Sequence, residues 1–379
     1  MNDDELTGAG TAEGEALMRS ARALRAPSHE AVGAYREQGE TLVAAVDAAM
    51  EKRPDIGALI GDNPLRVMRD NHRNHHKFML NVFALGRYEL LVRTLPWVYR
   101  AYGSHGFRND YFPAVLKAWV EAIAAHLAPG PAGELYLAYR WMLEQHETIE
   151  RLARSGWPPT DDEVGRVDAE VEQMVGLLTT GDFRACLTHA RERVRVAVDI
   201  PGYYVRVLQP ALVEIGRRWE RDELSVAEEH LATGVAGRVM AMLYGKIAKA
   251  PKTLGRAVVS CSAGELHEVG ARMAADLLEL DGWEVTFIGA DVPAADLLQL
   301  LRGQGPVLLA VSVTMPFNLN LAAELVRSVK GDPELSNIRV AVGGRAVRQL
   351  GEEGDLLGAD GTARDAVQLV ELARRWWNG

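Results

Sequence analysis

Short β-type runs alternate with helical patterns through the last third of the chain. These runs are rich in Val, Ala, Leu and Ile, and they span 256–261, 284–289, 307–313 and 338–343. Strands that alternate with helices pair in parallel, because each crossover helix returns the chain to the same end of the sheet. Residues 255–379 are therefore predicted to form a doubly wound, flavodoxin-like α/β domain.

The loop after the first run holds the clearest candidate for a ligand. Ligands bind beyond the carboxyl ends of parallel strands, and His267 lies in such a loop. Glu265 could hold one ring N–H of His267 and so fix its tautomer, which leaves the other nitrogen for a metal. Gly270 lets a bulky group approach the backbone. The alternative is an exposed loop histidine without a ligand.

Two further motifs follow in order along the same domain. The third run ends in Ser312 and Thr314, and the fourth ends in Gly343 and Gly344. The order Glu-x-His-x-x-Gly, Ser-x-Thr, Gly-Gly resembles the cobalamin-binding domain of methionine synthase, corrinoid methyl-carrier proteins and light-sensing cobalamin repressors. This resemblance covers residues 256–379.

The resemblance implies a role for each motif. His267 would be the lower axial ligand of cobalt, in place of the cofactor's own benzimidazole, and Glu265 would orient it. The family usually has aspartate at the position of Glu265. The residues that would line the slot for the displaced nucleotide tail are Ser312, Thr314, Gly343 and Gly344.

A second helical set precedes this domain, and residues 160–249 are predicted to form a four-helix bundle. The expected helices span 162–180, 182–198, 202–221 and 226–247. Helices of this length joined by short turns are typical of such bundles. Trp219 near the end of one helix, and Glu229 and His230 at the start of the next, should meet at one end of the bundle. The alternative is a tryptophan that only closes the bundle.

In this context the pattern resembles the bundle of light-sensing cobalamin proteins. The resemblance implies a cap over cobalamin, in which Trp219 covers an adenosyl group on the upper face and Glu229 and His230 lie beside it. The chain departs from that pattern at Glu220. The light-sensing repressors place a histidine there, which can bind cobalt after photolysis.

The N-terminal part is predicted to be all-helical. Residues 1–30 lack a sustained apolar stripe and are expected to be disordered or loosely helical. Residues 31–157 form a separate domain, whose expected helices span 31–52, 64–85, 87–102, 111–127 and 133–154. Aromatic and basic side chains concentrate here. They form either a packed core with a solvated face, or a pocket in which aromatics enclose a planar conjugated anion and arginines pair with its propionates.

Residues were selected for such a pocket by chemical type. The candidates are His72, Arg73, His75, His76, Arg87, Trp97, Arg100 and Trp141. His72 and His76, one helical turn apart, could alternatively bind a metal. The architecture resembles the photocobilins, in which a globin-like domain carries a bilin beside the cobalamin domains. This implies biliverdin, bound without a thioether because the domain has no cysteine. Haem, or no ligand, remains an alternative.

Charge and composition narrow the function. A net charge of −10 and the lack of a helix-turn-helix pattern or basic stripe before the bundle oppose binding to nucleic acid. No run is apolar enough for a bilayer and the acidic N-terminus is no signal peptide, so a cytoplasmic protein is expected. Cys186 and Cys261 do not suggest a disulfide framework.

The sequence thus predicts a light-sensing photoreceptor, not an enzyme, that binds adenosylcobalamin and signals as a homo-oligomer, a dimer, to an effector the sequence does not name. The alternatives are a corrinoid methyl carrier or cobalamin-dependent enzyme subunit, and a cobalamin repressor. Against the carrier, Trp219 would crowd the upper face, and no barrel domain for a substrate is recognisable.

Overall fold

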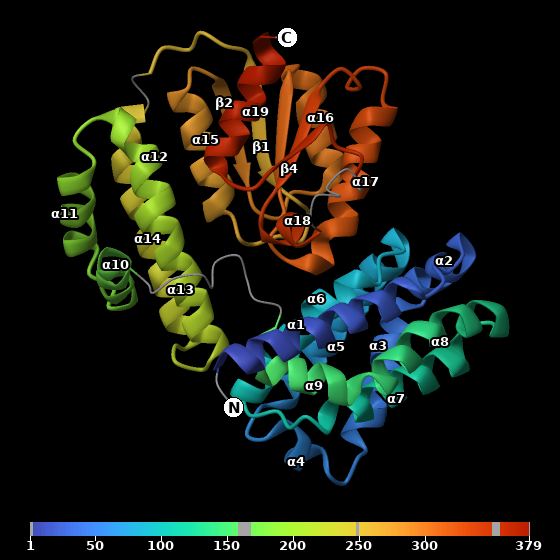
Figure 1. Ribbon diagram of the computed structural model, residues 1–379. Coiled ribbons are helices and arrows are strands. Elements are labelled where there is room, and N and C mark those ends of the chain that lie inside the picture. Colours follow the sequence, from blue (N-terminus) through green and yellow to red (C-terminus); the bar gives the residue numbers. More distant parts are fainter. Residues whose placement is uncertain (1–2, 158–167, 248–249, 351–356, 379) are drawn as a thin grey trace. The chain divides into compact units, whose positions relative to one another are not determined.

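The computed structural model describes residues 3–157, 168–247, 250–350 and 357–378 (Figure 1). The chain divides into two compact units, Met1–Gly165 and Arg166–Gly379. The expected boundary between the first helical domain and the bundle, at 157–160, lies at the edge of residues that the structure does not describe.

The described part of the first unit is entirely helical. Its helices are α1 (Asp3–Arg22), α2 (His29–Glu37), α3 (Gly39–Glu51), α4 (Ile56–Ile60), α5 (Leu65–Leu85), α6 (Glu89–Ser104), α7 (Tyr111–His126), α8 (Pro129–Glu144) and α9 (His146–Arg154). The all-helical prediction is confirmed. Whether the arrangement is globin-like stays a prediction.

Three details differ from the sequence-based expectation. Residues 3–22 form a full helix in the segment expected to be disordered or loosely helical, because Leu17 and Ala21, one turn apart, are both buried. The expected helix 31–52 breaks between α2 and α3, where a Cβ on Gly39 would meet the His76 ring at 2.5 Å. The expected helix 133–154 is likewise two helices, α8 and α9.

Large aromatic side chains fill the interior of the first unit. Tyr35, Trp119 and Tyr139 are fully buried, and the hydroxyls of the two tyrosines are 2.8 Å apart. Part of the expected aromatic pocket is therefore packed core.

The second unit begins with the helices of the expected cap. These are α10 (Ala169–Thr179), α11 (Phe183–Arg193), α12 (Ile200–Tyr203), α13 (Gln209–Glu220) and α14 (Val226–Ile247). One turn of π-helix, Tyr204–Leu208, joins α12 to α13, so the expected helix 202–221 runs through with a local bulge. Residues 162–167 and 248–249 of the expected bundle lie outside the described residues.

A parallel sheet forms the rest of the second unit. Its strands are β1 (Arg256–Cys261), β2 (Glu284–Gly289), β3 (Leu308–Ser312), β4 (Arg339–Gly343) and β5 (Gly361–Ala363). Their order, β2-β1-β3-β4-β5, with all pairs parallel, confirms the predicted doubly wound sheet. Strand β5 was not predicted from the sequence, because its three residues are too few to show a pattern.

Helices cover both sides of this sheet (Figure 1). They are α15 (Val269–Leu280), α16 (Ala294–Gln304), α17 (Leu319–Gly331), α18 (Arg345–Gln349) and α19 (Ala366–Asn378). Among the described residues, no helix combines the length and the apolar character needed to cross a membrane. Both cysteines are free and buried.

Helix α15 joins the cap to the sheet because its two faces belong to two cores. Met273 and Leu277 pack into the core of the bundle, whereas Ala275 and Leu278 pack into the core of the sheet. At this joint the hydroxyl of Tyr204, from the π-helical turn, donates to Oδ2 of Asp276 at 2.7 Å. Burial raises the pKa of Asp276 to about 6, even though this hydrogen bond lowers it.

The joint predicts a pH-dependent stability. Because the pKa of Asp276 is raised in the folded state, the folded chain keeps a proton on this carboxyl between about pH 4 and pH 6, where the unfolded chain has lost it. The free energy of unfolding therefore falls as the pH rises through this range. Asp276→Asn should therefore raise the melting temperature by a few degrees at pH 7.5, on the order of 2 kcal/mol, and by almost nothing near pH 3.5.

The control is Glu371→Gln, an exposed carboxylate on α19 that should leave the melting temperature unchanged at both pH values. A loss of stability in Asp276→Asn at pH 7.5 would contradict the account of the joint. Calorimetry at the two pH values measures the difference.

Candidate functional site

The candidate site lies in the loop between β1 and α15, beyond the carboxyl edge of the sheet. Gly264 adopts a φ of +74°, which lets the loop turn sharply after β1. Its N–H donates to Oδ1 of Asp291 at 2.8 Å, and the N–H of Asp291 donates to the carbonyl of Glu265 at 3.0 Å. The loop after β2 thus holds the loop after β1 in a fixed conformation.

Glu265 is a fully buried carboxylate that organises this edge. Its Oε1 accepts from Nδ1 of His267 at 2.5 Å and from the backbone N–H of the same residue at 3.1 Å. Its Oε2 accepts from the backbone N–H groups of Thr314 and Met315 at 2.9 and 2.8 Å, and from Nδ2 of Asn318 at 3.2 Å. One side chain therefore ties the loop after β1 to the loop after β3.

These contacts set the charge of the pair. Burial alone would raise the pKa of Glu265, but the hydrogen bonds from His267 and the backbone of Met315 hold it at about 2. The hydrogen bond to Glu265 raises the pKa of His267 in turn. The carboxylate is ionised at neutral pH and keeps a proton on Nδ1 of His267.

The other ring nitrogen of His267 is left for a ligand. The side chain is 56% exposed, and Nε2 makes no hydrogen bond within the described part of the chain. A histidine whose Nδ1–H donates to a carboxylate is the arrangement typical of a metal-ligating imidazole. The geometry therefore suits the predicted role of lower axial ligand.

The small residues predicted for the tail slot gather at the same edge. Ser312 lies opposite Cys261 on β1 and Gly343 on β4 in the strand ladders, so the three strand ends are level. Thr314 lies just beyond, and its hydrogen bond to Glu265 joins it to the histidine loop. A Cβ on Gly270 would meet nothing within 4 Å, so space is open there.

The glycine pair is also required by the protein's own packing. A Cβ on Gly343 would lie 2.8 Å from the carbonyl oxygen of Ala363, and one on Gly344 would lie 2.3 Å from that of Val313. Gly344 also adopts a φ of +101°. These glycines let the ends of β3, β4 and β5 come together, whether or not a nucleotide tail lies beside them.

The cap residues flank the turn between α13 and α14. Trp219 is half-buried near the end of α13, while the Glu229 side chain is 30% and that of His230 is 74% exposed at the start of α14. Nδ1 of His230 donates to Oε2 of Glu229 at 2.6 Å. The Glu229 charge is close enough to help raise the pKa of His267, so it lies on the same side of the sheet domain as the predicted ligand.

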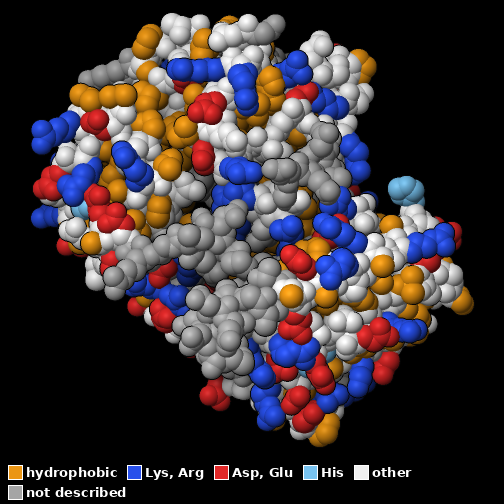
Figure 2. Space-filling view, viewed as in Figure 1, with side chains coloured by type: hydrophobic (Ala, Val, Ile, Leu, Met, Phe, Trp, Pro, Cys, Tyr) orange, Lys and Arg blue, Asp and Glu red, His pale blue; other side chains and the backbone are white. Residues whose placement is uncertain are grey.

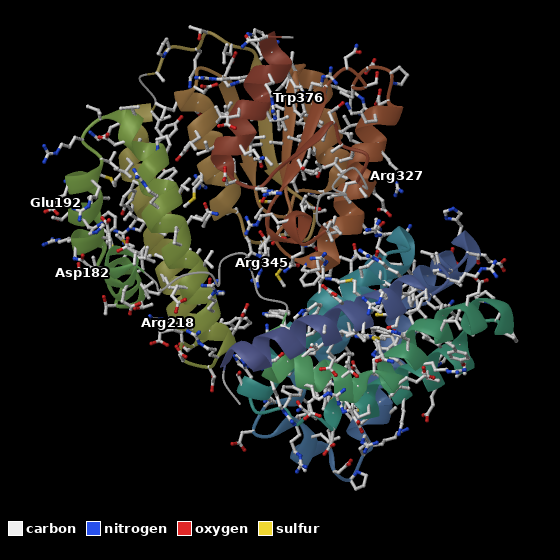
Figure 3. The ribbon with its side chains drawn as sticks, viewed as in Figure 1. Asp182, Glu192, Arg218, Arg327, Arg345 and Trp376 are labelled. Atoms are coloured by element: carbon white, nitrogen blue, oxygen red, sulfur yellow. The ribbon has the colours of Figure 1, made fainter. Side chains whose placement is uncertain are left out.

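Glu220, at the end of α13, forms an ion pair with Arg345 of the sheet domain. Nη1 of Arg345 donates to its Oε1 at 3.5 Å. Arg345 follows the glycine pair at the start of α18, at the lower end of the sheet in Figure 3. The residue that replaces the repressors' histidine therefore links the end of α13 to the loop of the predicted tail slot.

The first unit contains a small pocket with a cavity volume of about 40 Å³. Two of the candidates, His72 and His75, line it. The other lining residues are Asn71, Leu95, Val98, Tyr99, Tyr102, Tyr111, Phe112, Val115, Leu116, Trp119 and Met142. The lining contains no lysine or arginine.

The other candidates for the bilin site lie elsewhere. His76 stacks on Tyr35 and Arg73 pairs with Asp70, while Arg87 pairs with Glu89 and Arg100 donates to the carbonyls of Ala153 and Trp157. Trp141 is buried and donates to Ser20, and Trp97 is not among the residues that line the pocket. His72 and His76 belong to no group of three metal-ligating residues in the described part of the chain.

Several residues that the structure brings to the His267 site and to the pocket of the first unit were not predicted from the sequence. Asn318, Asp291 and Arg345 are far in sequence from His267, and no spacing rule connects them to it. In the pocket, Tyr102 and Tyr111 were not among the candidates, because residues were selected by chemical type and not by their position on a buried face. Periodicity along α7 could have placed Tyr111, Val115 and Trp119 on one buried face.

Comparisons with known proteins agree with this geometry. B12 binding domain models match residues 171–244 and 255–371. The HTH-type transcriptional repressor CarA of Myxococcus xanthus is 29% identical over 201 residues, which cover 48% of this chain and 66% of that protein, just under two thirds of its length. The repressor CarH of the same organism is 44% identical over 94 residues, 24% of this chain and 30% of CarH.

A corrinoid protein is similar over a stretch of comparable length. Dimethylamine corrinoid protein 3 of Methanosarcina acetivorans is 26% identical over 186 residues, which cover 49% of this chain and 86% of that protein. The second unit thus carries B12-binding domains, and the chain is a cobalamin-binding protein. It is related both to transcriptional repressors and to corrinoid proteins.

The anchor of His267 predicts how cobalamin affinity responds to mutation. In Glu265→Gln the side-chain amide would point N–H groups at the N–H donors of Thr314 and Met315, and the imidazole would lose its fixed orientation. Loss of such a partner costs about 10- to 100-fold in affinity. We expect this loss for hydroxocobalamin, measured by spectral titration.

Two further variants test this assignment. Glu268→Gln changes a neighbouring carboxylate that pairs with Arg272 and should bind normally. His267→Ala should bind at least as weakly as Glu265→Gln and should show the spectrum of a cofactor that carries its own base or water. An unchanged spectrum in His267→Ala would rule out the assignment of the lower ligand.

Proposed function

We propose that this protein is a photoreceptor that binds adenosylcobalamin between the helical cap and the sheet of its second unit. The single observation that carries the proposal is the placement of Trp219, Glu229 and His230 on the cap together with a carboxylate-anchored His267 on the sheet. When bound, adenosylcobalamin supplies a cobalt–carbon bond that visible light breaks.

The protein's residues then have distinct tasks. Nε2 of His267 would hold the cofactor from below, and Glu265 would orient the ring by accepting a hydrogen bond from the proton-bearing Nδ1. Trp219 would cover the adenosyl group, because a half-buried indole next to a polar helix start offers an apolar face to an adenine. The loss of that group would remove apolar contacts worth a few kcal/mol beneath the cap.

The joint between cap and sheet supports a response of this kind. The two parts meet at α15 through a packed apolar face, the buried Tyr204–Asp276 hydrogen bond and the Glu220–Arg345 pair. We propose that the cap shifts about this joint after illumination and changes the assembly of a homodimer, which an effector protein reads.

A methyl carrier is the second candidate, because dimethylamine corrinoid protein 3 is similar over 49% of this chain. A carrier must expose the upper face of the cofactor to a methyl donor, whereas the proposed position of Trp219 obstructs that face. We therefore favour the sensor, acting in the cytoplasm and not on nucleic acid. Charges of both signs are interspersed over the face seen in Figure 2.

We further propose that the pocket of the first unit holds biliverdin without a covalent bond. Aromatic rings line the pocket, and because its cavity of about 40 Å³ is smaller than a formed ligand site, the pigment would have to move these side chains apart as it binds. Because no cation lines the pocket, the propionates would point out of its mouth instead of pairing with arginines as first expected. Haem would need a histidine nitrogen directed at iron, but both nitrogens of His72 have partners and Nε2 of His75 lies 3.3 Å from the Tyr139 hydroxyl.

The cap predicts selectivity between two forms of cobalamin. Trp219→Ala should bind adenosylcobalamin about tenfold more weakly than the parent chain, since buried aromatic area is lost, and should bind methylcobalamin almost as well as the parent. Trp377→Ala on α19, which is 44% exposed and belongs to the sheet domain, is the matched control. The same loss for both forms would show that Trp219 only stabilises the bundle.

The first unit predicts a second set of spectral changes. Added biliverdin should give a red-absorbing band with induced circular dichroism that persists in His267→Ala and that denaturation abolishes without leaving covalent pigment. Free-pigment absorption and no induced signal would mean that the pocket is only packed core. A Soret band in the purified protein that survives removal of cobalamin would mean haem.

A further inference from the structure

A buried chain of hydrogen bonds leads from the surface of the first unit into its pocket. Oδ1 of Asp47 on α3 lies 2.5 Å from Nδ1 of His72 on α5, and Nε2 of His72 lies 2.9 Å from the hydroxyl of Tyr111 on α7. The side chain of His72 is 2% exposed and that of Asp47 is 17% exposed. His72 and Tyr111 both line the pocket, so this Asp47–His72–Tyr111 relay ends there.

The direction of the hydrogen bonds follows from the charge of each group. A carboxylate only accepts, so the proton between Asp47 and His72 is on Nδ1. Burial lowers the pKa of His72, although its hydrogen bond to Asp47 opposes that shift, so the ring is neutral at physiological pH. Nε2 of a neutral ring with a proton on Nδ1 can only accept, and Tyr111 therefore donates its O–H to His72.

Because Tyr111 donates its only proton to His72, its oxygen can offer the pocket only lone pairs, and so acts there as a hydrogen-bond acceptor. Hydrogen bonds in a chain polarise one another, so a phenol that donates into a carboxylate-backed imidazole is a stronger acceptor than an isolated phenol. Burial raises the pKa of Tyr111 far above its ordinary value, and the hydroxyl does not ionise. The relay thus offers a neutral but strong acceptor.

A second observation in the same pocket points to a polar ligand. Trp119 is fully buried and lines the pocket, yet its Nε1–H has no hydrogen-bond partner in the described part of the chain. A buried donor without a partner costs about 1–3 kcal/mol, a cost that a ligand with an acceptor group would remove. The pocket thus presents one strong acceptor and one unused donor between aromatic walls.

We propose that this pocket recognises a planar ligand through a pyrrole-type N–H that donates to the Tyr111 oxygen, and that Asp47 and His72 set the strength of this acceptor. The inference rests on the proposed tetrapyrrole site, and it names the Tyr111 oxygen as the group that recognises the N–H of the ligand. It also explains why the lining needs no cation, because recognition is through the ring nitrogens and not through the propionates.

The relay has a distinctive dependence on pH. When His72 becomes protonated, Nε2 turns into a donor, and Tyr111 can no longer donate to it, so the acceptor weakens. The groups that face His72 are Asp47 and Glu51 on α3, Tyr111 on α7, and Arg73 and His75 on its own helix. Affinity for the ligand should therefore fall as the pH falls through the pKa of His72, and loss of the Asp47 charge should move this fall to lower pH.

The test uses the full chain and biliverdin dimethyl ester, a probe with the pyrrole N–H groups but without titrating propionates. Asp47→Asn and Tyr111→Phe should each bind the ester about tenfold more weakly at pH 7.5. In Asp47→Asn the acid-side fall in affinity should move to lower pH, a shift that a structural role of Asp47 would not produce. Asp62→Asn, an exposed carboxylate of the same unit, and Tyr136→Phe, a tyrosine on α8 that does not line the pocket, are the controls.

A measurement without ligand keeps the relay separate from the proposed chromophore. In the apo chain labelled with ¹⁵N-histidine, the His72 signals, assigned by their loss in His72→Gln, should show the tautomer protonated on Nδ1. The tautomer protonated on Nε2, or equal affinities of the parent, Asp47→Asn and Tyr111→Phe, would overturn the relay even if the ester binds. No binding of the ester to the parent chain would refute the tetrapyrrole proposal and the ligand step with it, whatever the tautomer.

Discussion

The second unit depends on one buried carboxylate. Glu265 accepts hydrogen bonds from its own loop, from the loop after β3 and from Asn318, and it is fully buried. An ionised group in such a place is stable only because every acceptor site is used. The same hydrogen bonds that stabilise the buried charge also fix the tautomer of His267. The contacts that fold this edge of the sheet therefore also orient the histidine that would bind cobalt.

The cap is connected to this site through α15 and through one ion pair. α15 starts just after the histidine loop and belongs to the core of the bundle as well as to that of the sheet. The pair of Glu220 and Arg345 adds a second connection, from the end of α13 to the loop after the glycine pair. A change at the upper face of a cofactor would therefore meet the cap at Trp219, while a change at the lower face would reach the same cap through α15.

The features that depend on neighbouring residues in the chain could be predicted from the sequence. The alternation of apolar runs gave four strands to within a residue or two at each end, and Glu265 and His267 could be paired because they lie in one loop. Contacts that depend on the folded chain could not be predicted. Asn318, Asp291 and Arg345 reach the site from other loops, and the pocket of the first unit formed around tyrosines and not around the arginines chosen by charge. Residues 3–22 were expected to be disordered or loosely helical, because the helix that they form has only a short apolar stripe.

The central claim is that Nε2 of His267 binds the cobalt of cobalamin, and electron paramagnetic resonance of the loaded chain in the cobalt(II) state tests it most directly. An axial nitrogen splits each cobalt line, into a triplet for ¹⁴N and a doublet for ¹⁵N. The chain should be produced with ¹⁵N-histidine and loaded with unlabelled cofactor. The account predicts doublets, which should be absent from His267→Ala. Triplets in the labelled parent chain would show that the cofactor's own benzimidazole remains bound, and would contradict the account.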